Sequence, residues 1–270
     1  MSTRPGSWWD GTWNVVVGCL PVSPGCRYCY AARLAATQQT ARRVPLYEGV
    51  TEWKRGRPVF NGKLAVLPAH HENWTWPLSW VGAQYPVLGT GRPSLIFVGD
   101  MSDLFMEGHP AGVIDRVCAT LVASRHIGLL LTKRPERMAA YFSLPQAAAV
   151  QLRRQRKLWL GFSAERQIEF DTRWGHMRAL ASQGWTVFVS VAPMLGPVRL
   201  PPDFLAYGAR IWVICSGEQK CGGFRIMDPN WARALRDQCA AAAVPFNLLR
   251  MSHGQDIPPD LLVREFPLPE

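Results

Sequence analysis

The chain has 270 residues, of which 48% are hydrophobic and 19% are charged. This much apolar side chain excludes an intrinsically disordered protein, and the length is enough for a full hydrophobic core without disulfides. Apolar runs such as residues 211–215 are too short to cross a bilayer, and residues 1–6 contain no apolar stretch of the signal-peptide type. We therefore expect a soluble, cytoplasmic protein that folds as one domain over residues 1–270.

The net charge is +10, and most of the basic residues are arginine. Arginine binds phosphate and stacks on bases, so the charge indicates a nucleic-acid partner; a basic surface that only reflects coding bias is the alternative. The excess is largest in residues 125–178, which hold 11 basic against 4 acidic residues. Within this segment, residues 153–157 form either a phosphate-contacting cluster or the solvated end of a helix.

The first predicted elements flank a turn. Residues 12–17 are β-branched and aromatic and predict a strand that ends at Gly18. Pro24-Gly25 is a turn signal, and residues 29–36 predict a helix. Residues 40–93 are rich in Pro, Gly and Trp with weak periodicity, so we expect an irregular insertion or lid there. Its tryptophans either pack onto the domain, which we favour, or stack on bases.

Three of the seven cysteines lie close together, in the pattern C-x6-C-x2-C formed by Cys19, Cys26 and Cys29. The odd number of cysteines and the expected reducing compartment argue against a disulfide framework. The turn before Cys26 folds Cys19 back toward the other two. Three local thiolates suit a [4Fe–4S] cluster that leaves one iron open for a ligand. A zinc site with a distant fourth ligand, or no metal at all, are the alternatives.

Strands and helices alternate regularly after the insertion. Apolar strands are predicted at residues 94–99, 127–131, 158–162, 186–191, 211–215 and 244–249, with helices beginning near residues 110, 135, 167 and 229. Strands that are apolar throughout are typical of a parallel sheet buried on both faces. Together with residues 12–17, the pattern predicts an α/β fold, a partial (β/α) barrel of about six to seven parallel strands. An open doubly wound sheet is the alternative.

Polar residues follow most of these strands. In parallel α/β folds the ligand binds at the carboxyl ends of the strands, so residues at these ends are candidates for one pocket beside the cysteines. They are Asp100, Ser102, Asp103, Lys133, Arg134, Ser163, Glu165, Ser190, Ser216 and Glu218. Asp103, Ser163 and Ser216 are also explained as helix caps.

Several of these segments together resemble the phage-associated three-cysteine-motif family, a group of unknown function related to radical SAM enzymes. The resemblance is carried by the cysteine segment, by Met101-Ser102-Asp103, by Thr132-Lys133-Arg134-Pro135 and by Ser216-Gly217-Glu218, and it spans nearly the whole chain. The first cysteine gap has six residues where radical SAM enzymes usually have three. Ala192-Pro193 and Ser216-Gly217-Glu218 stand where the family pattern has Glu-Pro and Gly-Gly-Glu.

The resemblance implies an incomplete (β/α) barrel in which Cys19, Cys26 and Cys29 hold a [4Fe–4S] cluster that binds S-adenosylmethionine (SAM). It implies a 5′-deoxyadenosyl radical and an external electron donor. For the substrate we expect a nucleic-acid base that is modified, rearranged or repaired in isomerase- or lyase-type chemistry, such as a hypermodified thymine of phage DNA.

The same resemblance places the polar residues in roles. Tyr28 or Tyr30 would support the adenine of SAM, and Asp100 or Asp103 would bind its ammonium group or ribose. Lys133 and Arg134 would meet a substrate carboxylate or phosphate. The cofactor pocket would be completed by Ser102, Ser163, Glu165, Ser190, Ser216 and Glu218.

Two other functions stay open at this stage. One is a non-catalytic DNA-binding protein stabilised by zinc or by a cluster. The other is a nuclease-like hydrolase that uses Asp100, Asp103, Glu165 and Glu218 around Mg²⁺.

Overall fold

The computed structural model describes residues 7–110, 112–143 and 156–267. Its centre is a seven-stranded sheet in the order β1-β6-β7-β8-β9-β10-β11, and every neighbouring pair of strands is parallel. The strands are β1 (Gly11–Trp13), β6 (Leu95–Val98), β7 (Ile127–Thr132), β8 (Leu158–Ser163), β9 (Thr186–Val191), β10 (Ile211–Ser216) and β11 (Phe246–Arg250). The predicted parallel half-barrel is confirmed. A doubly wound sheet would reverse its strand order, and this sheet does not.

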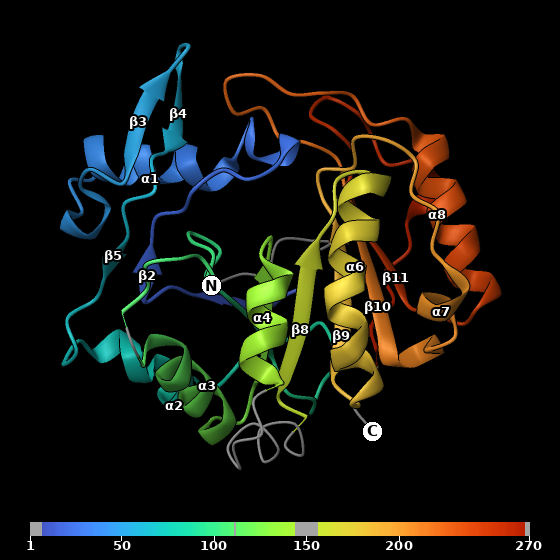
Figure 1. Cartoon of the computed structure of the whole chain (residues 1–270), viewed down its shortest axis with the longest axis horizontal. Coiled ribbons are helices and arrows are strands. Elements are labelled where there is room, and N and C mark those ends of the chain that lie inside the picture. The colour runs from blue at the N-terminus through green and yellow to red at the C-terminus, as the bar shows by residue number, and fades with distance from the viewer. Residues whose placement is uncertain (1–6, 111, 144–155, 268–270) are drawn as a thin grey trace.

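Helices cover the outer face of the curled sheet. They are α3 (Val113–Ala123), α4 (Pro135–Phe142), α6 (Gln167–Ser182), α7 (Pro202–Leu205) and α8 (Pro229–Ala241). Figure 1 shows α4 and α6 over β8 and β9, with α7 and α8 beside β10 and β11. Within the described part of the chain, none of the helices combines the length and apolarity needed to span a bilayer.

The two faces of the sheet belong to different apolar clusters. In β6, Ile96 and Val98 join the large cluster under the helices, whereas Leu95 and Phe97 point to the other face. That inner face is filled mainly by aromatic side chains, namely Trp8, Phe97, Trp159, Phe188 and Trp212. Because both faces are buried, the strands are apolar at nearly every position.

The predicted strand over residues 12–17 is wrong in one respect, because it is interrupted. β1 ends at Trp13, and β2 (Val16–Val17) leaves the main sheet to pair antiparallel with β5 (Ala65–Val66). Asn14 lies at the break. Its side chain donates a hydrogen bond to the carboxylate of Asp100 and accepts one from the Met101 amide at 3.1 Å.

Residues 40–93 contain more regular structure than an irregular insertion would. After α1 (Tyr30–Thr40) come η2 (Pro45–Tyr47), the hairpin of β3 (Thr51–Lys54) and β4 (Arg57–Phe60), β5, η3 (Glu72–Thr75) and α2 (Trp76–Ser79). Trp74 is buried, and the rings of Trp76 and Trp80 stack 4.9 Å apart. Trp53 is 69% exposed. Packing therefore explains three of these tryptophans but not Trp53, and a lid role for the segment stays a prediction.

Candidate functional site

The three cysteines lie on one loop between β2 and α1, here called the cysteine loop (residues 18–29). Cys19 follows β2, Cys26 ends the 3-10 turn η1 (Pro24–Cys26), and Cys29 is the N-cap of α1. All three are free and partly exposed. The loop begins at Gly18, where φ is +101° and a Cβ would stand 2.1 Å from the Lys63 carbonyl oxygen, so the entry to the loop requires glycine.

The thiols share one electrostatic neighbourhood. Burial raises the pKa of Cys19 to about 12; Asp103 and the other two cysteines add to this rise, and Arg134 opposes it. Burial also raises the pKa of Cys29, and Cys26 adds to this rise. Backbone amides in the first turn of α1 lower the pKa of Cys29 instead. A metal centre must therefore displace protons from these thiols when it binds.

Cys19, Cys26 and Cys29 are the candidate ligands of a metal centre. Over the residues that the structure describes, no three His, Cys, Asp or Glu side chains form a group that could hold a metal ion. Three thiolates from one loop are a donor set that both zinc and iron–sulfur centres use. The other cysteines lie elsewhere: Cys118, Cys215 and Cys239 are in the core, and Cys221 lies beside Arg33.

Glu165, after β8, holds the middle of the cysteine loop. It is fully buried, and it accepts hydrogen bonds from Ser23 Oγ at 2.6 Å and Arg173 Nη1 at 3.0 Å, and pairs with Lys133. Burial by itself would raise the pKa of Glu165, but the two cations outweigh it and lower the pKa to about 2. A Cβ on Gly25 would stand 2.3 Å from Glu165 Oε1, so the loop also packs directly on this carboxylate.

Arg134, after β7, holds the first part of the loop. It is almost completely buried and donates to the Leu20 carbonyl at 3.1 Å, to Asp103 at 3.0 Å and to Glu107 at 3.0 Å. Asp103 also accepts a hydrogen bond from Thr132 Oγ1 at 2.6 Å. The structure therefore places Arg134 and Asp103 in an internal clamp, with their charges directed at one another.

Glu218, after β10, holds the loop through a third arginine. It accepts hydrogen bonds from the Arg225 backbone amide at 2.8 Å and from Arg225 Nε at 2.9 Å. Arg225 in turn donates to the Pro24 carbonyl at 3.0 Å and lies 5.5 Å from the centre of the Tyr28 ring. Arg27 and Arg57 each lie 5.3 Å from the same ring. Tyr28, expected beside adenine, is thus surrounded by the chain's own guanidinium groups.

Tyr30 and Asp100 lie together beside Cys29. The Tyr30 hydroxyl donates to the Asp100 carbonyl at 3.3 Å, and the side chain is 41% exposed. Neighbouring atoms nevertheless desolvate the Tyr30 hydroxyl, which raises its pKa well above the usual value. The charges of Asp100 and Cys29 add to this rise. Burial also raises the pKa of Asp100. Ser102 lies at the start of the cysteine loop, because its backbone forms a β-bridge with Gly18.

The three predicted serines end neighbouring strands. Ser163 and Ser190 are paired in register at the carboxyl ends of β8 and β9. Both serines are buried, and in the described parts of the chain neither hydroxyl has a hydrogen-bond partner. Ser216 donates to the Gly217 carbonyl at 3.1 Å.

The structure thus brings the predicted residues to one edge of the sheet but separates their roles. Three of the four acids proposed for Mg²⁺ are each paired with arginine or lysine, and Asp100 bonds to Asn14, so the acids do not converge as the hydrolase hypothesis requires. Three side chains that tie the loop down were not among the predicted site residues, namely Ser23, Arg173 and Arg225. Their only signal was that they lie near motif residues.

Six of the eleven basic residues at 125–178 are paired with carboxylates. Carboxylate partners are present for Lys133, Arg134, Arg137, Arg166, Arg173 and Arg178, and Lys157 donates to backbone carbonyls. The predicted cluster at residues 153–157 lies mostly outside the described residues.

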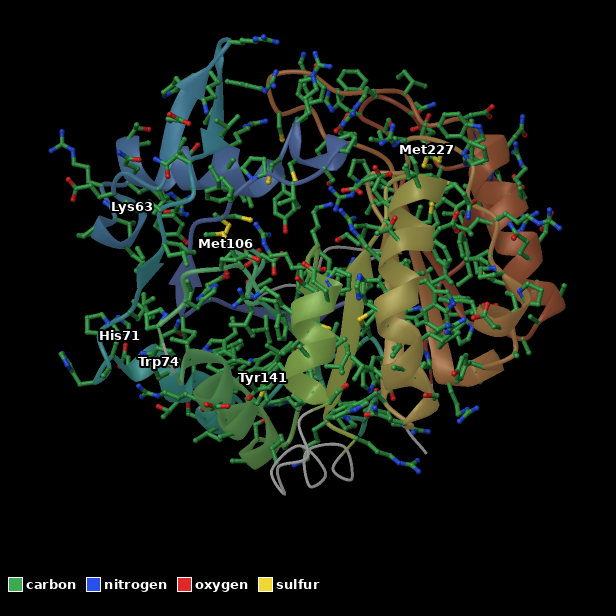
Figure 2. All side chains as sticks on the ribbon, viewed as in Figure 1. Lys63, His71, Trp74, Met106, Tyr141 and Met227 are labelled. Carbon is green, nitrogen blue, oxygen red and sulfur yellow. The ribbon has the colours of Figure 1, made fainter. Side chains whose placement is uncertain are left out.

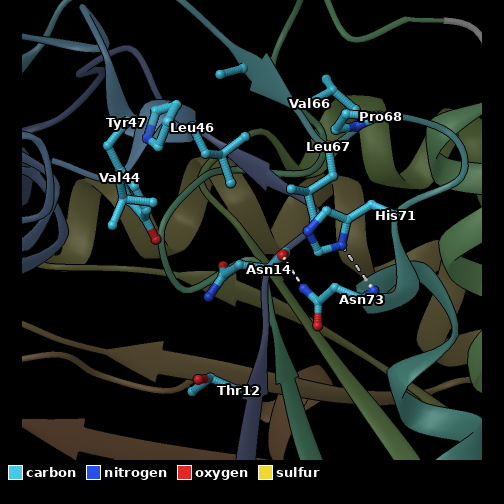
Figure 3. Close-up of a pocket in the computed structure, with 12 residues that line it drawn as sticks. Thr12, Asn14, Val44, Leu46, Tyr47, Val66, Leu67, Pro68, His71 and Asn73 are labelled. Carbon is cyan, nitrogen blue, oxygen red and sulfur yellow. Dashed lines mark hydrogen bonds between the residues drawn. The ribbon is translucent and has the colours of Figure 1, made fainter. Parts of the chain in front are cut away.

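A cavity of about 750 Å³ opens between β1 and residues 44–73 (Figure 3). Its lining combines apolar Val44, Leu46 and Leu67 with polar groups such as Asn73 and His71, and it contains no Asp, Glu, Lys or Arg. Asn14 connects this cavity to Asp100, but none of the cysteines lines it. Figure 2 shows His71 and Trp74 on this side, with Lys63 above them toward the cysteine loop.

Comparison with known proteins gives a family and a set of similar folds. The sequence pattern described as Protein of unknown function (DUF5131) matches residues 5–256. No curated protein sequence matches the chain.

Three similar solved structures are all of spore photoproduct lyase. A cysteine-to-serine mutant has a TM-score of 0.46 and 15% identity, with 89% of this chain and 64% of the lyase chain covered. A complex with dinucleoside spore photoproduct has a TM-score of 0.46, 11% identity and coverages of 87% and 74%. A mutant with bound AdoMet and the dinucleoside has a TM-score of 0.45, 12% identity and coverages of 88% and 75%. The chain thus spans less than two thirds of the first structure, and similarity this low transfers no activity and no residue role.

Proposed function

The chain belongs to the family described as Protein of unknown function (DUF5131), and we propose a function from its own site. The proposed function is that of a radical SAM-type [4Fe–4S] enzyme that modifies, rearranges or repairs a nucleic-acid base. The observation that carries this proposal is the position of Cys19, Cys26 and Cys29. They share one loop at the carboxyl edge of a parallel half-barrel, where ligands of such folds bind.

Cys19, Cys26 and Cys29 would hold a [4Fe–4S] cluster, and such a cluster would supply the electron for the reductive cleavage of SAM. The chain's own contribution is to fix the loop. Glu165 holds Ser23, Arg134 holds the Leu20 carbonyl, and Arg225 holds the Pro24 carbonyl. These three contacts come from segments that follow three different strands. They keep the cysteines in place when the thiols lose their protons, which is the preorganisation that such a site needs.

For SAM, the best supported contacts are the free hydroxyls of Ser163 and Ser190 and the Tyr30–Asp100 pair beside Cys29. Lys133 and Arg134 already bind Glu165 and Asp103, so their proposed contact with a substrate anion has less support. A nucleic-acid substrate is supported by the net charge of +10. The external electron donor, the phage association and the cytoplasmic location belong to the same proposal.

The test is anaerobic reconstitution of the purified chain with iron and sulfide. We expect a brown protein with iron–sulfur charge-transfer absorbance that, once reduced, converts SAM to methionine and 5′-deoxyadenosine. Cys26→Ala should lose the absorbance and the cleavage, whereas the matched control Cys239→Ala, which changes a core thiol, should keep both. A colourless chain without iron would overturn the proposal, and stoichiometric zinc would point to the DNA-binding alternative.

A further inference from the structure

Three segments far apart in the sequence meet beside Tyr28. They are the cysteine loop, the β3–β4 hairpin and residues 218–225. Arg57 of β4 and Arg225 both lie against the Tyr28 ring, and Arg33 of α1 donates to the Lys220 carbonyl at 2.6 Å. Figure 1 shows the hairpin projecting past α1 at the same edge of the molecule as the loop between β10 and α8.

Two glycines permit this close approach. A Cβ on Gly222 would stand 3.0 Å from the Cβ of Arg57, and one on Gly223 would stand 2.5 Å from the Tyr28 ring. Their φ angles of +77° and +149° also disfavour other residues. The three segments therefore form one continuous surface whose parts are packed on each other.

This surface is strongly positive. Residues 20–33, 51–63 and 218–225 hold eight basic residues against two acidic ones. The two acids are used locally, since Glu52 pairs with Lys54 and Glu218 pairs with Arg225. Six cations have no carboxylate partner within the described ranges, namely Arg27, Arg33, Arg55, Arg57, Lys63 and Lys220. In residues 125–178, by contrast, six of the cations have a carboxylate partner, either inside the segment or on Asp103, Glu107 and Asp203.

The hairpin adds an aromatic platform. Trp53 is 69% exposed, more than any of the tryptophans packed in the insertion, and Lys54 and Arg55 follow it at the exposed turn. Trp53 is paired in register with Pro58, so it lies on the hairpin face opposite Arg57 and close to the turn that carries Arg55. An exposed indole near an unneutralised cation is a combination that binds single strands, because bases stack on the ring and phosphates meet the cation.

We infer that this surface, here called the basic surface (Arg27, Arg33, Trp53, Arg55, Arg57 and Lys220), binds single-stranded nucleic acid and delivers one of its bases to the edge that carries the cysteines. The inference rests on the proposed function for the fate of that base. The binding step itself requires neither the cluster nor SAM.

The experiment measures binding of a fluorescein-labelled single-stranded DNA of mixed sequence by fluorescence anisotropy over a range of salt concentrations. A second strand of the same length, with abasic sites in place of nucleosides, carries the phosphates without the bases. Wild-type protein should bind the complete strand more tightly, and log K should fall linearly with log salt.

Two variants separate stacking from charge. Trp53→Ala should weaken binding of the complete strand by at least about fivefold and leave the abasic strand almost unchanged. Arg55→Ala should weaken both strands and lower the salt slope by about 0.7, because one phosphate fewer is then neutralised. Controls at the opposite end of the strands are Tyr85→Ala, which removes an exposed ring, and Arg125→Ala, which removes an exposed cation; neither should change binding.

The inference is overturned if both hairpin variants bind the two strands like wild type. It is also overturned if polyglutamate competes as well as DNA and Trp53→Ala has no effect, which would assign the surface to an acidic protein instead. Iron content and SAM cleavage measured on the same variants keep the two proposals apart. Normal cleavage without DNA binding removes only the basic surface, and DNA binding without iron removes only the radical chemistry.

Discussion

The part of the chain before β6 and the part after it are held together by different interactions. After β6, each strand pairs with the next strand in sequence, and helices pack on the outer face through a large apolar cluster. Before β6, the strands have two to four residues, and the local apolar cluster under α1 is small. The cysteine loop in this region is fixed by charged side chains from strand ends of the other region, which reach Ser23 and the Leu20 and Pro24 carbonyls.

The regular region is therefore a scaffold, and the cysteine loop depends on it. Changes to the tethers should damage the loop and the buried charges together, whereas changes on the exposed faces of the regular region should have small effects.

Arg134→Leu should lower the free energy of unfolding by about 3–5 kcal/mol, because it leaves the buried carboxylate of Asp103 without its cation. It should also release the Leu20 carbonyl, so less iron is retained after reconstitution. Urea unfolding measures the first effect and iron analysis the second. Arg137→Ala removes an exposed partner of the same Glu107 and should cost less than about 1 kcal/mol. Equal losses in the two variants would contradict the clamp.

Glu165→Gln tests the second tether through pH. The pKa of Glu165 is about 2, below its usual 4.5. Its stabilising contribution is therefore fully present above about pH 4.5 and is lost as the pH falls toward 2. The shift corresponds to a free energy on the order of 3 kcal/mol. The variant should lose roughly this much at pH 7 and show a flatter stability profile between about pH 4.5 and 2, the range of that shift.

A series of urea titrations against pH measures this difference. The control is Asp260→Asn, which changes a carboxylate that also pairs with two arginines, Arg233 and Arg236, but in solvent. Its profile should stay close to that of wild type, because water screens exposed pairs. A Glu165→Gln profile as steep as wild type would show that the buried carboxylate does not depend on Lys133 and Arg173.

Gly25→Ala should affect the loop more than the scaffold. The new methyl group would stand 2.3 Å from Glu165 Oε1, so either the turn or the carboxylate must move. We expect a loss of about 1–3 kcal/mol in unfolding free energy and a marked loss of iron after reconstitution. Calorimetry and iron analysis on one preparation measure both. Full iron occupancy in this variant would mean that the loop tolerates displacement.

Gly175→Ala is the matching change in the regular region. Gly175 lies on the exposed face of α6, and nothing stands within 4 Å of a Cβ there. Alanine should therefore raise the unfolding free energy by about 1 kcal/mol through helix propensity, with no change in iron content. Destabilisation by this variant would contradict the expectation that changes on exposed faces of the regular region have small effects.

Much of the fold could be predicted because its pattern is local. Strands such as residues 158–162 and 186–191 are apolar at nearly every position, which is the mark of a sheet covered on both faces, and the structure has them at Leu158–Ser163 and Thr186–Val191. The break in the strand at Asn14 was missed because a β-branched run looks the same whether or not one of its side chains bonds to another segment. Here Asn14 bonds to Asp100 and Met101, which follow β6. Trp53 could not be separated from Trp74 by composition, since only their neighbours differ.

Local patterns in the chain were enough to predict the three-cysteine motif, about six to seven parallel strands, and the polar residues at the ends of those strands. These follow from residues adjacent in the chain, through hydrophobic periodicity and turn chemistry. Only the tertiary structure decided which of those charges are already paired. The contacts from Glu165 to Ser23 and from Arg134 to Leu20 join residues 142 and 114 positions apart, and burial makes each cation select the nearest carboxylate or carbonyl in space. In the hairpin, Lys54 pairs with Glu52, whereas Arg55 and Arg57 have no carboxylate partner among the described residues. This difference depends on which groups lie close in space, which the order of residues along the chain does not encode.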